Sequence, residues 1–237
     1  MFYWLIPLIV GVILLAVFLF FRVKEKRVTA VIFKGFVSLM FIITAIVALL
    51  TSNNPSSIFG IFIIIGLCFG LLGDVFLDIK FIDLKHEFLF TVLGFFAFAF
   101  GHIAYMCGLF LVFFDFSSSV FYLLVPFFVA VMLCAVTLLM ERFTPIRYEN
   151  MKPFVVIYGM FLFFTTSIYM SSAIQTGWNN TTLMIMAIAF IVFMLSDLIL
   201  NNTYFAKGYG TAPYIIANHA LYYIAQFMIA VSLFFLL

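Results

Sequence analysis

Long apolar stretches recur along this sequence, and they limit the possible folds more than any other feature. Each is close to the ~20 residues that an α-helix needs to cross the hydrocarbon core of a bilayer. Polar or turn-forming segments separate them. The sequence therefore predicts an all-α membrane protein with eight transmembrane helices, at about residues 3–21, 30–51, 58–78, 88–113, 119–140, 153–175, 182–200 and 213–236.

The composition leaves no room for a sizeable soluble domain. Only 8% of the 237 residues are charged, whereas a soluble domain has about 25%. We expect one polytopic membrane domain over residues 1–237, surrounded by the lipid bilayer, and the net charge of +2 gives no reason to expect a nucleic-acid partner. The three cysteines lie inside apolar stretches and fit small buried side chains better than a disulfide framework or a metal site: Cys68, Cys107 and Cys134.

The predicted loops alternate in charge. The first, third, fifth and seventh loops all contain lysine or arginine, and the other loops contain neither. Because positively charged loops remain in the cytoplasm, we expect the odd-numbered loops there and both termini on the outer side. The compact chain and its short loops indicate a multi-pass protein of a bacterial inner membrane.

Two aspartates stand inside apolar stretches, in similar local sequences. Asp74 lies in GDVFLD at residues 73–78, and Asp197 lies in SDLILN at residues 196–201. A carboxylate in lipid costs at least ~2.5–3.5 kcal/mol at a helix centre, so such residues usually face a protected interior and act there. We therefore predict a functional role for both aspartates.

A histidine motif follows each aspartate. His102 lies in GHIAY at residues 101–105, and His219 lies in NHALY at residues 218–222. Each half of the chain therefore contains an aspartate followed by a histidine.

The spacing of these motifs predicts an internal duplication. The two aspartates are 123 residues apart, the two histidines 117, and Lys34 and Tyr158, each followed by glycine, 124. The pseudo-repeats would cover about residues 1–115 and 116–237. With four helices in each half, they would be parallel repeats about an axis along the membrane normal.

Further polar side chains stand where they can reach the aspartates. Asp78 is one turn from Asp74 on the same helical face, and Tyr105 is one turn beyond His102. The last helix carries a polar stripe at i, i+3, i+4 and i+7, which is typical of a helix that lines a cavity: His219, Tyr222, Tyr223 and Gln226.

Three of these residues also have simpler interpretations. Lys34 either snorkels to the interface or points inward to an aspartate or a phosphate. Asp78 either contributes to the site or is a solvated residue at a helix end. His102 either lines the site or only forms a hydrogen bond between helices.

The depth of the polar residues in their helices predicts a pocket. Lys34, Asp74, Asp197 and His219 all fall in the cytoplasmic third of the membrane. We therefore expect a pocket that opens toward the inner leaflet, with His102 at its floor.

Four segments together resemble the YhhN family of membrane proteins. They are residues 66–77, ending in GDVFL, FGHIAY at 100–105, FMLSDLIL at 193–200 and YYIAQ at 222–226. The resemblance covers most of the chain and preserves the order of the motifs. The sequence departs from the family at Gly35, where proline is frequent, and at Gly101, where alanine is frequent, and neither difference removes an ionisable group.

Characterised members of that family are lysoplasmalogenases. The resemblance implies hydrolysis of the vinyl ether bond of a lysoplasmalogen, a lysophospholipid taken from the membrane, to a fatty aldehyde and a glycerophospho-headgroup. It implies neither a metal nor an organic cofactor. Protonation of the β-carbon leaves an oxocarbenium ion that water attacks, and a neutral carboxylic acid beside a carboxylate suits both steps.

We expect Asp74 and Asp197 to form the acid/base pair, and the residues leave open which of them is the acid. The other polar residues would orient water or substrate: Lys34, Asp78, His102, Tyr105, Tyr158, His219, Tyr222, Tyr223 and Gln226.

Two other functions agree with the same residues. Parallel repeats around a central polar site also suit a small transporter or lipid-binding protein. A catalytically silent member of the family, acting in lipid homeostasis, is the third hypothesis.

Overall fold

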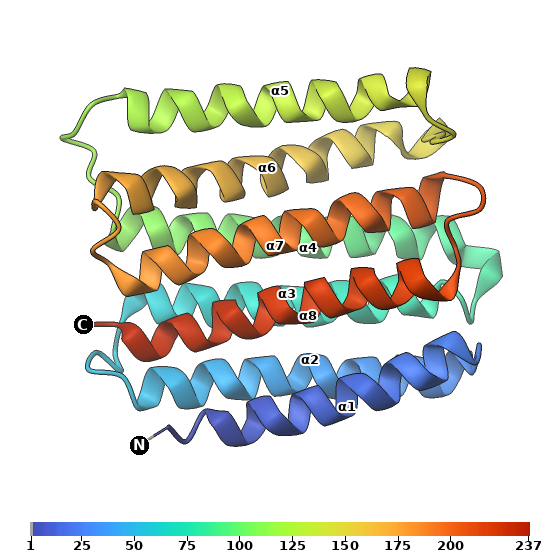
Figure 1. The fold of residues 1–237 in the computed structure, drawn as a ribbon, viewed down its shortest axis with the longest axis horizontal. Coiled ribbons are helices and arrows are strands. Elements are labelled where there is room, and N and C mark those ends of the chain that lie inside the picture. The colour runs from blue at the N-terminus through green and yellow to red at the C-terminus, as the bar shows by residue number, and fades with distance from the viewer. Residues whose placement is uncertain (1) are drawn as a thin grey trace.

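The computed structural model describes residues 2–237, which form a bundle of long antiparallel helices (Figure 1). Eight of these helices are long and apolar enough to cross a membrane. This confirms the predicted all-α, multi-pass membrane fold. The helices are α1 (Leu5–Val23), α2 (Arg27–Leu50), α3 (Ile58–Ile79), α4 (Glu87–Val112), α5 (Phe121–Phe143), α6 (Lys152–Gln175), α7 (Thr181–Phe205) and α8 (Ala212–Ser232).

Short 3-10 turns adjoin three of the long helices. They are η1 (Leu84–His86), η2 (Glu149–Met151) and η3 (Leu233–Phe235). α7 continues five residues beyond its predicted end at residue 200. Asn202 there donates its amide to the carbonyl of Leu198, at 2.8 Å, so this polar side chain bonds to its own helix instead of stopping it.

The neighbours of each helix show how the two halves meet. Helices that are consecutive in sequence pack against each other, apart from α4 and α5, and the most extensive contacts between the halves are α4 on α6 and α8 on α2. Exchanging the first four helices with the last four converts one of these contacts into the other. This exchange agrees with the predicted duplication, and the duplication itself stays a prediction.

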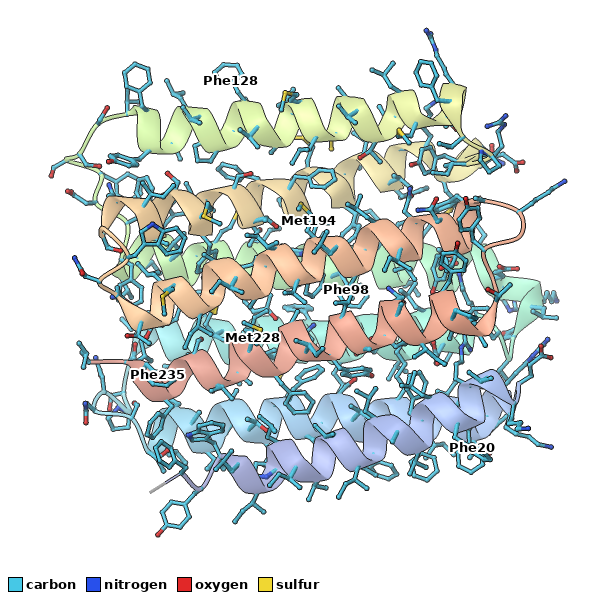
Figure 2. The ribbon with its side chains drawn as sticks, viewed as in Figure 1. Phe20, Phe98, Phe128, Met194, Met228 and Phe235 are labelled. Carbon is cyan, nitrogen blue, oxygen red and sulfur yellow. The ribbon has the colours of Figure 1, made fainter. Side chains whose placement is uncertain are left out.

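The two outermost helices are held differently. α1 packs on α2 and also reaches α8, whereas α5 packs on α6 at the opposite edge of the bundle (Figure 1). The buried residues of α5 are Pro126, Ala130 and Cys134. Large apolar side chains such as Phe20 and Phe128 project outward from the bundle, which is the surface expected of helices in contact with lipid (Figure 2).

Close packing of α3 on α4 fixes the position of the first aspartate. A Cβ atom at Gly73 would lie 2.6 Å from the ring of Phe98, and one at Gly101 would lie 3.1 Å from the carbonyl oxygen of Gly66. The missing side chains let the two helices approach closely. Asp74, directly after Gly73, is thereby held in the interior of the bundle, where it is 2% exposed.

Both termini lie at one end of the bundle, and the lysine- and arginine-bearing loops lie at the other (Figure 1). This arrangement follows from the even number of helices. The orientation of these ends in the membrane, with the termini outside, stays a prediction.

Candidate functional site

A small enclosed space, the polar cavity, lies inside the bundle between the two halves. It offers about 30 Å³ to the centres of water molecules, and a single water needs roughly 10–15 Å³ by that measure. Residues from both halves line it: Lys34, Asp74, Leu77, Phe95, Phe98, Tyr158, Ser196, Asp197, Leu200, Tyr204, Asn218, His219 and Tyr222. The fold therefore brings the two aspartates to one water-sized cavity.

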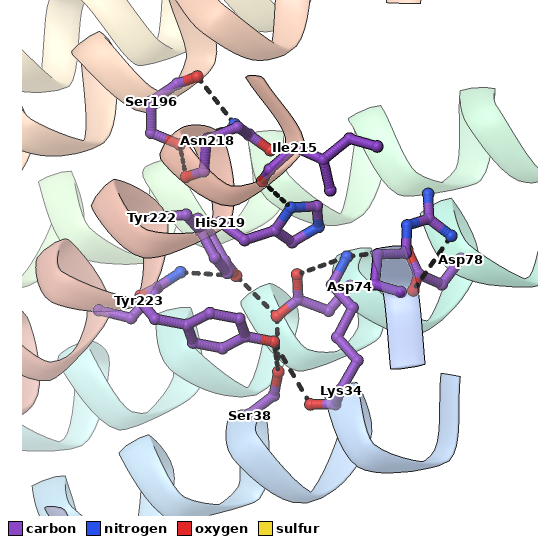
Figure 3. Close-up of polar contacts among 12 residues, drawn as sticks. Lys34, Ser38, Asp74, Asp78, Ser196, Ile215, Asn218, His219, Tyr222 and Tyr223 are labelled. Atoms are coloured by element: carbon purple, nitrogen blue, oxygen red, sulfur yellow. Dashed lines mark hydrogen bonds and ion pairs between the residues drawn. The ribbon is translucent and has the colours of Figure 1, made fainter. Parts of the chain in front are cut away.

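Asp74 is surrounded by hydrogen-bond donors (Figure 3). The ammonium of Lys34 lies 3.3 Å from its Oδ1. The hydroxyls of Ser38 and Tyr222 donate to its Oδ2 at 2.6 Å and 2.8 Å. A carboxylate with an ammonium and two hydroxyl donors has its negative charge compensated inside the protein.

Lys34 also pairs with the second carboxylate of α3. Its Nζ lies 3.1 Å from Oδ1 of Asp78, and Nη1 of Arg22 lies 4.0 Å from the other oxygen of Asp78. Lys34 is 4% exposed and Asp78 1%. Snorkelling of Lys34 and solvation of Asp78 are therefore the wrong alternatives. Together with Asp74, the cluster contains two positive and two negative charges, and this balance offsets part of their desolvation.

Asp197 has different surroundings. It is half-buried, and the hydroxyl of Tyr158 donates to its Oδ2. Within residues 2–237, no lysine, arginine or histidine nitrogen lies within 4.0 Å of it. The ring of Tyr158 stacks on Phe95, with centroids 5.5 Å apart, and this contact orients its hydroxyl. The two aspartates of the cavity thus differ in that only Asp74 has a cation beside it.

A reciprocal pair of hydrogen bonds connects α7 to α8 next to the cavity. Ser196 donates its hydroxyl to the carbonyl of Asn218 at 3.1 Å, and Asn218 donates its amide to the carbonyl of Ser196 at 2.8 Å. The next residues in each helix are Asp197 and His219. This clamp therefore fixes the direction in which both side chains leave their helices.

His219 lies in the wall of the cavity with one ring nitrogen engaged. Its Nδ1 donates to the carbonyl of Ile215 at 2.8 Å, so Nε2 remains an acceptor. The ring of Phe18, from α1, packs edge-on against it at 5.0 Å between centroids.

The rest of the polar stripe on α8 supports Tyr222. Gln226 donates its amide to the Tyr222 hydroxyl at 2.9 Å, and that hydroxyl donates to Asp74. The hydroxyls of Tyr223 and Ser38 lie 3.1 Å apart. These contacts fix the positions of the two hydroxyls that donate to Asp74, those of Tyr222 and Ser38.

Five residues predicted for the site do not line the cavity: Asp78, His102, Tyr105, Tyr223 and Gln226. Of these, His102 and Tyr105 are buried among aromatic rings, where His102 packs 5.3 Å from Phe193 and 5.9 Å from Tyr158, measured between ring centroids. Both His102 nitrogens and the Tyr105 hydroxyl have no hydrogen-bond partner among residues 2–237. Buried polar groups in this condition are typical positions for ordered water. His102 thus lies outside the cavity lining and contacts Tyr158, which belongs to it.

A second hollow, the lateral groove, adjoins the polar cavity on its α5 side. It offers about 60 Å³ to the centres of water molecules. It is mostly apolar and is lined from α4 to α7: Phe95, Cys134, Thr137, Leu138, Val155, Val156, Tyr158, Gly159, Leu162, Phe163, Asp197, Leu198, Leu200, Asn201, Tyr204 and Phe205. The lining of the cavity shares Tyr158 and Asp197 with that of the groove.

A comparison with known families decides which family this chain represents. The model of the YhhN family matches residues 29–233. The chain belongs to the YhhN family. Neither a curated protein nor a solved structure matches it.

The YhhN match contains every residue that lines the polar cavity. It does not include α1, although Arg22 of that helix reaches Asp78 and Phe18 covers His219. The YhhN residues that form the site thus have two further contacts from a helix outside the matched region.

Several residues in or near this YhhN site were not predicted from the sequence. Ser38 is one of them, and its signal was its position one turn after Lys34 on the same face of α2. Lys80 is another, because a lysine just after a helix is ordinarily solvated. It is 5% exposed, and its Nζ lies 3.3 Å from the ring centroid of Tyr204 and 5.1 Å from that of Phe81. Burial lowers the pKa of Lys80 to about 8.

Proposed function

We propose that this protein is a lysoplasmalogenase-like hydrolase that cleaves the vinyl ether bond of a lysoplasmalogen. The observation that carries the proposal is the unequal pair of carboxyl groups on one water-sized cavity. Asp74 has Lys34 beside it at 3.3 Å, and Asp197 has a tyrosine hydroxyl and no cation among residues 2–237. Two carboxyl groups in such different surroundings suit one proton donor and one carboxylate.

Asp197 is the acid in this proposal. An ionised carboxyl group without a cation is strongly disfavoured in an apolar interior, so it takes up a proton instead. Asp74 is the carboxylate, because Lys34 and two hydroxyls compensate its charge. The surroundings of each group thus support this assignment over the reverse one.

The first step is proton transfer to carbon. Asp197 gives its proton to the β-carbon of the vinyl ether, the π electrons form the new C–H bond, and the α-carbon and ether oxygen share the resulting positive charge. The negative charge of Asp74, together with the newly formed carboxylate of Asp197, stabilises this oxocarbenium ion.

The second step is the addition of water to the α-carbon. A water molecule in the polar cavity forms the new C–O bond and releases a proton to Asp74, which gives a hemiacetal. The hemiacetal then breaks its bond to the ether oxygen. Asp74 gives this oxygen the proton that it took from water, and the oxygen leaves as the alcohol of the glycerophospho-headgroup. The hemiacetal hydroxyl gives its proton to Asp197 as the carbonyl of the aldehyde forms, so both aspartates return to their starting states.

The remaining residues of the site position these groups. Ser38 and Tyr222 hold Asp74, and Tyr158 holds Asp197. Asp78 and Arg22 keep the charge around Lys34 balanced. The Nε2 of His219 is an acceptor that can orient the water, since its Nδ1 is already engaged.

The test is aldehyde release from lysoplasmenylethanolamine by the purified protein in detergent. We expect turnover by the wild type, and losses of about 10²–10⁴-fold in Asp74→Asn and Asp197→Asn, the usual range for removal of a general acid or base. Asp83→Asn is the matched control, because Asp83 lies in a loop and its side chain is 42% exposed. Folded Asp74→Asn and Asp197→Asn proteins with wild-type rates would refute the mechanism.

A second measurement separates hydrolysis from transport. The protein is reconstituted in liposomes, and both the flux of the labelled lysolipid and the release of aldehyde are followed. Turnover is expected, and flux without turnover would favour a transporter instead.

A further inference from the structure

We propose that the lateral groove binds the single hydrocarbon chain of the lipid substrate. The inference rests on the hydrolase function proposed above and adds to it where the chain lies and from which side the lipid approaches the aspartates.

The lining of the groove suits a hydrocarbon chain. Away from its polar end it consists of small or apolar side chains: Cys134, Leu138, Val155, Gly159, Leu162 and Phe163. Gly159 has no side chain to fill the space between α5 and α6. A Cβ atom there would lie 3.3 Å from the Sγ of Cys134. Measured as for the polar cavity, the groove offers about 60 Å³ to the centres of water molecules, against about 30 Å³ in the cavity. Since these helices cross the membrane, lipid chains are the molecules that surround the groove.

The groove is continuous with the reaction site. Five residues line both the groove and the polar cavity and form the wall between the two hollows: Phe95, Tyr158, Asp197, Leu200 and Tyr204. Asp197 is half-buried, whereas Asp74 is 2% exposed and lies on the cavity side. A chain in the groove therefore brings its first carbons beside Asp197.

This arrangement matches the polarity of a vinyl ether. Its β-carbon, which receives the proton, is on the chain side, and its α-carbon, which receives water, is on the oxygen side. A chain in the groove places the β-carbon toward Asp197 and the α-carbon toward the cavity with Asp74. Asp197, the proposed proton donor, thus lies beside the carbon that is protonated, and Asp74 lies beside the carbon that water attacks.

The opposite side of the cavity is closed. There α1 covers the site, with Phe18 fully buried against His219 and Tyr223 and with Arg22 reaching Asp78. α5, which borders the groove, packs on α6 and leaves the Asp197 side open. Access from the membrane is therefore on the α5 side.

A further hollow between α5 and α6 does not fit the same role. It lies around Tyr122, Pro126 and Met170 and shares no residue with the polar cavity. A chain bound there would not bring its ether to either aspartate.

The test uses a lysophosphatidylethanolamine with a diazirine in its one acyl chain, which binds without being a vinyl ether. After irradiation, we expect label on peptides that contain residues 134–138 and 155–163. Gly159→Leu should reduce this labelling about tenfold, the loss that corresponds to about two methylenes without burial. Leu138→Trp, which narrows the groove from α5, should do the same even if Gly159→Leu fails to fold.

Gly35→Leu is the matched control, because it adds the same leucine side chain as Gly159→Leu but away from the site. A Cβ atom at Gly35 has no atom within 4 Å. This variant should label like the wild type. In the activity assay, Gly159→Leu should lower kcat/KM for a 16-carbon alkenyl chain about tenfold relative to an 8-carbon chain.

The two proposals fail in different ways. Label at the groove without any vinyl ether turnover would refute the proposed function and leave the chain site standing. Turnover with label elsewhere, or with label that Gly159→Leu and Leu138→Trp do not reduce, would refute the chain site and leave the hydrolase standing.

Discussion

The ammonium of Lys34 lies 3.3 Å from the carboxylate of Asp74, and both side chains are buried. Lys34 is also 3.1 Å from Asp78, so one cation serves two carboxylates of the same helix. Asp197, the other aspartate of the cavity, has no such neighbour among residues 2–237. The proposed roles of Asp74 as the carboxylate and Asp197 as the acid rest on this difference in their surroundings.

Lys34→Met should therefore reduce both activity and stability. Removal of one partner from a buried ion pair costs about 3–5 kcal/mol, since it leaves uncompensated charge. We expect an earlier thermal unfolding transition in detergent and a kcat at least about 10²-fold lower, because Asp74 loses its counter-ion.

The double variant Lys34→Met, Asp78→Asn checks the cause. In the double variant Arg22 and Asp74 remain as one positive and one negative charge. We therefore expect its thermal unfolding transition at a higher temperature than that of Lys34→Met alone. Lys24→Met, in an exposed loop position, is the control for the loss of a lysine. An equally early transition in the single and double variants would contradict the charge-balance explanation.

Tyr158→Phe should lower kcat by about tenfold, the effect of one lost hydrogen bond of ~1–1.5 kcal/mol. Its hydroxyl is the group that orients Asp197, while its ring keeps the stacking contact with Phe95. KM should change little. Tyr169→Phe is the control, because the hydroxyl of Tyr169 donates to the carbonyl of Tyr105 at 2.8 Å, away from the cavity. Equal losses of kcat in the two variants would assign Tyr158 a merely structural role.

The fold was predictable because hydropathy acts locally. Each membrane crossing needs its own run of apolar residues, so the eight helices could be located without knowledge of their contacts. The end of α7 was wrong by five residues because Asn202 bonds to its own helix, which composition does not reveal.

The site was predictable only in part, for the same reason. Asp74 and Asp197 stand out because a carboxylate is rare in lipid. A serine in an apolar helix does not stand out, so Ser38 was missed until the packing of α2 on α3 placed its hydroxyl 2.6 Å from Asp74. His102 was expected at the floor of the pocket, but it does not line the cavity and packs against the ring of Tyr158 instead, a contact between α4 and α6.

Isotopic labelling tests the proposed proton transfer directly. In D₂O, the aldehyde should carry one deuterium on carbon 2, and it should be a single enantiomer, since Asp197 is fixed on one side of the substrate by Tyr158 and by the Ser196–Asn218 clamp. In ¹⁸O-water, the glycerophospho product should be unlabelled, because water attacks the vinyl carbon. Mass spectrometry and NMR of the reduced aldehyde give both results. A racemic product, or ¹⁸O in the headgroup, would contradict the mechanism.

Lys80 provides a prediction about pH. It is buried over the ring of Tyr204, a residue of both the cavity and the groove, and no carboxylate of residues 2–237 pairs with it. Because Lys34 is already shared by two carboxylates, we expect Lys80 to contact the phosphate of the proposed substrate. Its lowered pKa of about 8 means that it is charged below that pH and neutral above it. The KM for the lysolipid should therefore rise as the pH increases through about 8, with kcat less affected.

Lys80→Met separates this effect from other titrations. At pH 7 we expect its KM to be about tenfold higher than that of the wild type, as for the loss of one charge-assisted contact of roughly 1.5 kcal/mol. The rise of KM near pH 8 should disappear in this variant, because the group that titrates has been removed. Lys85→Met, an exposed lysine five residues along the chain, should keep both the wild-type KM and its pH dependence. If Lys80→Met retains the wild-type KM profile, the phosphate is bound elsewhere.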